Sequence, residues 1–162
     1  MFLMLSATIS GEILAHFESA MAAMPVLITF IPMLMGTSGN SGSQSSTIVI
    51  RGLSVGEIEF KDFFKVIFKE IRIAFICGVL LAAANGIRIY IMYGHDIMLA
   101  IALGITMIAI ITMAKCIGCT LPLLAKKLGA DPALMAAPLI STIMDTCTIL
   151  MYFTIVTAFF HL

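Results

Sequence analysis

The sequence predicts an all-α membrane protein, and its composition and chain length carry this prediction. Apolar residues make up 61% of the 162 residues, charged residues make up 11%, and the mean hydropathy is +1.14. Soluble domains contain about 45–50% apolar and about 25% charged residues. A chain this small has too little interior to hide so much apolar surface from water. A soluble enzyme, a nucleic-acid-binding protein and a disordered tail are therefore excluded.

Five apolar segments follow one another along the chain, within a single domain over residues 1–162. We expect them to be helices, because backbone polar groups in lipid must be satisfied internally. The predicted spans are 2–17, 24–50, 71–93, 97–124 and 133–160. Four meet or nearly meet the length of about 20 residues that a spanning helix needs. The first is shorter and carries Glu12, so we expect it to be completed by upstream residues or tilted against protein.

The basic residues predict the orientation of these spans. Seven of the nine Lys and Arg residues fall in segments 51–72 and 125–131, and segments 12–24 and 93–96 contain none. The positive-inside rule then places the N-terminus in the cytoplasm and the C-terminus outside. Lys115 is an exception inside the fourth span, and we expect it to snorkel toward the cytoplasmic interface.

Residues 57–71 have an amphipathic pattern. Lysines occupy one face, and the other face is apolar. The predicted apolar face consists of Phe60, Phe63, Phe64, Ile67 and Ile71. The pattern predicts a helix that either lies at the cytoplasmic interface or leads into the third span.

Asp145 lies near the middle of the last predicted span, where an ionised carboxylate is costly unless it meets water, a cation or a partner. It shares a helical face with other oxygen-bearing residues, and Pro138 leaves the carbonyl at position 134 without its helical donor. The stripe consists of Pro138, Ser141, Thr142, Asp145 and Thr148. Oxygen ligands suit Mg²⁺ and Ca²⁺. The alternative is that Asp145 pairs with Lys115 or bonds to a neighbouring helix.

A second polar stripe lies inside the second span, over residues 36–47. Asn40 and Gln44 bring carbonyl oxygens, and the small residues around them allow close helix approach. The residues on one face are Gly36, Asn40, Ser43, Gln44 and Thr47. A packing seam or a Ser/Gly loop is the alternative. Together with Asp145, the stripe predicts a water-filled path between two polar faces.

No residue set typical of an enzyme is visible, so we expect no enzymatic activity. The chain shows no Ser-His-Asp set, phosphate loop or facing pair of intramembrane aspartates. Cys116 and Cys119 form a CxxC in an apolar span without companion histidines, and we interpret their thiols as buried and free.

Two groups of motifs resemble signatures of the MgtE magnesium channel family. The residues similar to the second-helix signature are Ile31-Pro32, Gly39-Asn40-Ser41-Gly42-Ser43-Gln44, Arg51-Gly52-Leu53 and Gly56-Glu57. The residues similar to the fifth-helix signature are Asp131-Pro132-Ala133, Pro138 and Ser141-Thr142-x-x-Asp145. The similarity runs from about residue 8 to the C-terminus.

The resemblance implies a homodimer of five-helix protomers in the bacterial plasma membrane, with a pore at the two-fold axis lined by the second and fifth helices. Asp145 would form the Mg²⁺ site, and we expect further ligands from Asn40, Gln44, Ser141 and Thr142. The partners would be a second copy, the lipid bilayer and Mg²⁺, with no nucleic acid. Thr148 stands where the family pattern has glycine, so we expect it to narrow the pore or add a ligand.

Charge and symmetry complete the hypothesis. A two-fold axis brings two Asp145 carboxylates together, and they repel unless a divalent cation lies between them. We expect a largely hydrated Mg²⁺ that enters the cytoplasm down its electrochemical gradient. The family's cytosolic domains are not in these 162 residues, so an excised pore domain and a naturally short member both stay open. The alternative functions are an ion-coupled divalent cation exchanger and a non-conducting membrane assembly subunit.

Overall fold

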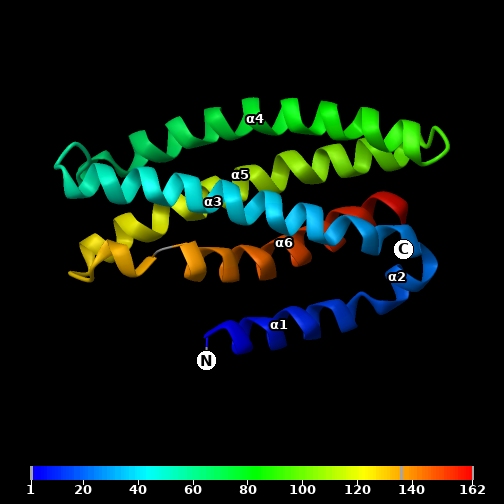
Figure 1. The fold of residues 1–162 in the computed structure, drawn as a ribbon, viewed down its shortest axis with the longest axis horizontal. Coiled ribbons are helices and arrows are strands. Elements are labelled where there is room, and N and C mark those ends of the chain that lie inside the picture. The colour runs from blue at the N-terminus through cyan, green and yellow to red at the C-terminus, as the bar shows by residue number, and fades with distance from the viewer. Residues whose placement is uncertain (1, 136, 162) are drawn as a thin grey trace.

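The computed structural model describes residues 2–135 and 137–161, which form a bundle of helices without a strand (Figure 1). Helices α4 and α1 lie at opposite edges of the bundle, and α3, α5 and α6 lie between them. In chain order the elements are α1 (Phe2–His16), α2 (Glu18–Ala23), η1 (Pro25–Phe30), α3 (Ile31–Ser54), η2 (Phe60–Asp62), α4 (Phe63–Met92), α5 (Ile97–Lys127), η3 (Pro132–Met135) and α6 (Ala137–Phe160).

The predicted all-helical class is confirmed, and two helices of the described chain are long and apolar enough to cross a membrane. These are α5 and the part of α6 over Leu139–Phe160. Helices α3 and α4 have 24 and 30 residues and are long enough by length alone, and α3 carries the polar run over residues 36–47. Helix α1 has 15 residues and rises about 22 Å, less than a hydrocarbon core of about 30 Å. Five spans therefore stay a prediction.

Two predicted boundaries change in the structure. The segment predicted as one span over 24–50 begins as the 3₁₀ helix η1, and the α-helix starts only at Ile31 and continues to Ser54. The amphipathic segment leads directly into the third span, since α4 is continuous from Phe63 to Met92.

Only part of the predicted apolar face of this amphipathic segment packs on the protein core. Phe60, Phe63, Val66 and Ile67 pack on a cluster formed by Val49, Leu53, Cys119 and Leu123. Phe64, which belongs to the predicted apolar face, is 82% exposed and does not pack on this cluster. The buried positions follow the spacing i, i+3, i+4, i+7 from Phe63, and this spacing ends on Glu70 rather than Ile71.

The connecting segments gather at two ends of the bundle. Segments 55–62 and 128–131 lie at one end, and segments 17–24 and 93–96 lie at the other (Figure 1). The seven basic side chains of segments 51–72 and 125–131 are all exposed. We call the first end the basic end. The separation of charge that the sequence predicted is confirmed, and the sidedness of the termini stays a prediction.

Helices α3 and α5 cross at two glycines. A methyl group on Gly118 would meet the backbone of Gly42, lying 3.0 Å from its Cα atom and closer still to its carbonyl group. Small residues permit this approach, which any side chain would block. The crossing brings the inner face of α3 against the middle of α5.

Candidate functional site

The polar stripe of α3 lies on one open face, as the sequence predicted. Asn40, Gln44 and Thr47 are exposed and Ser43 is half-buried. With Ile48, these side chains line a depression of about 460 Å³. The second polar motif is therefore an accessible surface of a helix rather than a loop, and within the described chain no other helix covers it.

The predicted ligands on α6 lie beside this surface. Ser141, Thr142 and Asp145 are half-buried. Helix α6 packs on α3 where Ser141 faces Gly39, since a methyl group on Gly39 would lie 3.7 Å from Ser141 Cβ. Gly39 precedes Asn40 in the chain, and Ser141 lies one helical turn before Asp145. The contact between α3 and α6 thus places the two polar stripes next to each other.

Asp145 occupies the boundary between two contact faces of α6. Met144 contacts Gly42 of α3 on one side, and on the other side Thr146 Oγ1 lies 3.1 Å from Ser10 Oγ of α1. Successive residues of an α-helix are about 100° apart, so Asp145 points between α3 and α1. In the part of the chain that the structure describes, its carboxylate forms no hydrogen bond or ion pair. The alternative of a partner for Asp145 within the described chain is therefore wrong.

Thr148 does not reach the polar surface, contrary to the sequence-based expectation. Its side chain is buried, and Thr148 Oγ1 donates a hydrogen bond of 2.6 Å to Ser38 Oγ on the inner face of α3. The polar residues of α6 that lie beside the open face of α3 therefore end at Asp145. The side chain of Pro138 lies outside the described residues, so the bare carbonyl at position 134 stays a prediction.

Lys115 is likewise placed differently from its prediction. It is 6% exposed, and its Nζ atom lies 3.4 Å from Glu70 Oε2 of α4. Twelve residues separate Lys115 from the end of α5 at Lys127, a rise of about 18 Å that a lysine side chain cannot cover. Sequence reasoning missed the partner, because Glu70 lies beside the lysine-rich face of the amphipathic segment and was not assigned to the inner one.

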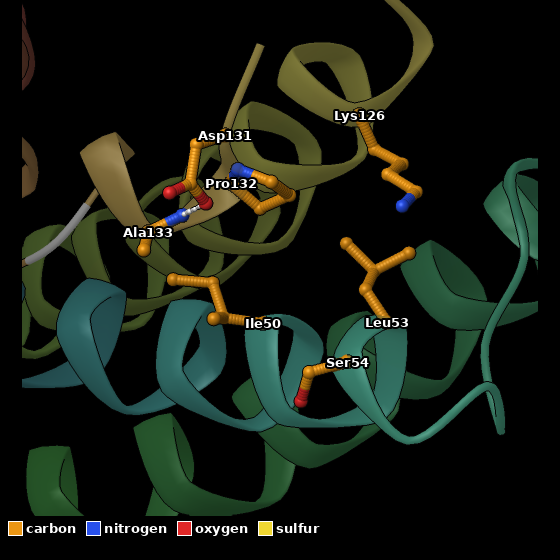
Figure 2. A pocket seen from close by; sticks show the side chains of 7 residues that line it. All are labelled: Ile50, Leu53, Ser54, Lys126, Asp131, Pro132 and Ala133. Atoms are coloured by element: carbon orange, nitrogen blue, oxygen red, sulfur yellow. Dashed lines mark hydrogen bonds between the residues drawn. The ribbon is translucent and has the colours of Figure 1, made fainter. Parts of the chain in front are cut away.

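A pocket of about 250 Å³ lies at the basic end, between α3, α5 and η3 (Figure 2). Asp131 Oδ1 accepts a hydrogen bond of 2.9 Å from the backbone N–H of Ala133, which closes the start of η3. Pro132 follows at the first position, where its missing N–H costs no helical hydrogen bond. The Asp-Pro-Ala motif therefore shapes the turn that precedes α6.

Ionisable metal ligands do not cluster in the part of the chain that the structure describes. Within residues 2–135 and 137–161, no group of three or more His, Cys, Asp or Glu side chains is close enough to bind one ion. The cysteines, including Cys116 and Cys119, are free. What the fold does bring together is one carboxylate on α6 and an open row of amide and hydroxyl groups on α3.

A protein-family model matches most of the chain. The model of the MgtE family, described as a divalent cation transporter, matches residues 31–155. The chain belongs to the MgtE family. The matched range runs from the start of α3 into α6 and so contains both polar stripes.

Three magnesium transporters named MgtE are similar to the chain. The protein of Bacillus subtilis is 36% identical over 157 residues, which cover 94% of the chain and 34% of the relative. That of Thermus thermophilus is 33% identical over 153 residues, with the same coverage. The protein of Enterococcus faecalis is 32% identical over 153 residues, which cover 93% of the chain and 33% of the relative. The chain spans about a third of the length of these curated relatives.

Proposed function

We propose that this chain forms the membrane pore of a Mg²⁺ transporter, which carries the ion into the cytoplasm through the two-fold axis of a homodimer. The observation that carries the proposal is Asp145, a carboxylate without a hydrogen bond or ion pair in the described chain, next to the open polar face of α3. Membership of the MgtE family and the names of the three relatives support Mg²⁺ as the substrate.

The need to cover the polar face supports the dimer. Asn40, Gln44 and Thr47 are exposed on a helix whose neighbours α5 and α6 are long and apolar enough to span a membrane. Polar groups in a membrane face a protein partner or water rather than lipid. A second copy that meets the first along α3 covers both faces at once and encloses a polar path between them.

The chemistry of the path suits a hydrated divalent cation. Two Asp145 carboxylates from two protomers repel each other, and a charge of +2 between them relieves this repulsion better than a single charge does. Mg²⁺ gives up its water reluctantly and is commonly held by one or two carboxylates. Asn40 and Gln44 would then contact the ion through its water, and Ser141 and Thr142 would add hydroxyl groups.

The membrane potential is sufficient to drive entry. A potential that is negative inside contributes about 2.3 kcal/mol per charge per 100 mV, or about twice this for Mg²⁺. Flux should therefore proceed without ATP and without a gradient of a second ion. A strict requirement for a sodium or proton gradient would instead indicate a coupled exchanger.

The test is uptake of Mg²⁺ into liposomes that contain the purified protein, followed with an enclosed Mg²⁺-sensitive dye. Asp145→Asn keeps the shape of the side chain but removes its charge, and we expect it to abolish the flux while the protein stays folded and dimeric. Glu12→Gln is the matched control, because it removes an exposed carboxylate from α1, another predicted span. Wild-type flux from the Asp145→Asn protein would overturn the proposal.

A further inference from the structure

The face of α3 opposite the open stripe carries a buried polar cluster. Ser45 Oγ donates a hydrogen bond to Glu70 Oε2 on α4, and Lys115 Nζ on α5 donates to Ser45 Oγ at 3.2 Å and to Glu70 Oε2 at 3.4 Å. The three residues are 0%, 3% and 6% exposed. One hydroxyl group of α3 is thus bonded to two other helices.

A second polar link holds the same face of α3 two turns earlier. Ser38 Oγ accepts a hydrogen bond from Thr148 Oγ1 on α6, and both side chains are buried. Ser38 and Ser45 are seven residues apart, a rise of about 10.5 Å. Asn40 and Gln44, the proposed water contacts of the ion, lie between these two links on the open side.

Between the two links, the contact of α3 with α5 fixes the separation of these two helices but not their rotation. Gly42 of α3 meets Gly118 of α5 without a side chain on either helix. Backbone packed on backbone offers no knob that holds a helix against turning about its own axis. Leu34, Val49 and Leu53 anchor the ends of this face in the apolar core. At the crossing itself, the directional hydrogen bonds of Ser38 and Ser45 are the contacts that resist a rotation of α3 against α5 and α6.

Stability alone does not explain the cluster. Replacing a buried ion pair by apolar residues of similar volume often leaves the stability of a protein unchanged or raises it. The best-attested role of such buried polar groups is to select one alignment of neighbouring helices over others. We propose that Ser45, held by Glu70 and Lys115, is a positioning residue that sets the rotation of α3 and thereby aims Asn40 and Gln44 into the path of the ion. This inference rests on the proposed function for its role in transport.

Two double variants separate positioning from charge. In Glu70→Gln/Lys115→Met both charges are lost, but the amide oxygen of the new side chain still accepts from Ser45. In Glu70→Leu/Lys115→Met no acceptor is left, and apolar side chains of similar volume maintain the packing. Ser45→Ala removes the hydroxyl group itself. Thr106→Val is the control, because Thr106 on α5 is buried but bonds only to Ala102 O of its own helix.

The direct measurement is the rotation of α3 in lipid vesicles, read from the reaction of introduced cysteines with a water-soluble thiol reagent. The protein's own four cysteines are first replaced by serine or alanine. Gln44→Cys reports the open face and Ser46→Cys reports the buried one. We expect the ratio of the Gln44→Cys rate to the Ser46→Cys rate to fall about tenfold in Ser45→Ala and in Glu70→Leu/Lys115→Met. The ratio should stay unchanged in Glu70→Gln/Lys115→Met and in Thr106→Val.

The second measurement is the Mg²⁺ concentration that gives half-maximal flux. It should rise about tenfold in the same two proteins and stay at the wild-type value in Glu70→Gln/Lys115→Met and Thr106→Val. An unchanged labelling ratio in Glu70→Leu/Lys115→Met would overturn the inference, even if Ser45→Ala does not fold. Absence of Mg²⁺ flux from the wild type would instead overturn the proposed function, and the labelling ratio would still decide whether Ser45 positions α3.

Discussion

Gly118→Ala should destabilise the protein, because the added methyl group has no room at the crossing of α3 and α5. Its Cβ would lie 3.0 Å from the Cα atom of Gly42 and closer to the carbonyl group. These are backbone atoms, so relief requires the two helices to move apart. Overpacking of this kind costs about 1–3 kcal/mol.

Gly104→Ala on the same helix is the matched control. A methyl group there meets only Ala82 Cβ at 3.7 Å, an ordinary contact. Both variants gain the higher helix propensity of alanine, worth about 1 kcal/mol. This gain cancels when the two variants are compared, so their difference in unfolding free energy should equal the clash of about 1–3 kcal/mol.

The assay is thermal unfolding in detergent, followed by the reaction of a fluorogenic maleimide with Cys119 in proteins whose half-buried Cys77, Cys116 and Cys147 are replaced by serine. This thiol is buried and lies next to position 118, so it reacts only when the crossing opens. Gly118→Ala should become reactive at a lower temperature than the wild type, and Gly104→Ala at the same or a higher temperature. If Gly118→Ala unfolds no earlier than Gly104→Ala, the close crossing of α3 and α5 is refuted.

Two further predictions concern stability in the same assay. Lys115→Met alone leaves Glu70 as a buried charge without its cation and should cost about 3–5 kcal/mol, whereas Glu70→Gln/Lys115→Met should unfold near the wild-type temperature. Equal losses in the two proteins would contradict the ion pair. Asp96→Ala removes the cap of α5, in which Asp96 Oδ1 accepts from Leu99 N at 2.9 Å, and should cost about 1 kcal/mol, with Asp96→Asn as the conservative control.

Helical periodicity in the sequence was sufficient to predict the open face of α3. Asn40, Gln44 and Thr47 follow one another at helical spacing, and this spacing places them together whatever packs around them. The same argument placed Ser141, Thr142 and Asp145 on neighbouring parts of α6. Helical spacing alone decides which residues share a face of a helix, so a single sequence is sufficient to predict these faces.

The partners of buried polar groups were beyond reach of the same argument. Thr148 shares the spacing of the Asp145 stripe, but its hydroxyl group bonds to Ser38, 110 residues earlier in the chain. Lys115 was expected at the interface because Glu70 was not recognised as an inward residue. Such pairs depend on which helices become neighbours, and helical spacing within one segment does not contain this information.

The polar inner face of α3 has a consequence for how the protein is made. Lys115, which binds Ser45, lies 70 residues later in the chain. When α3 leaves the ribosome, Ser45 has not yet met Glu70 or Lys115, and a nascent segment with this many polar groups enters lipid poorly on its own. We therefore expect α3 to stay at the insertion machinery until α5 is synthesised, so that α3, α4 and α5 enter the bilayer together.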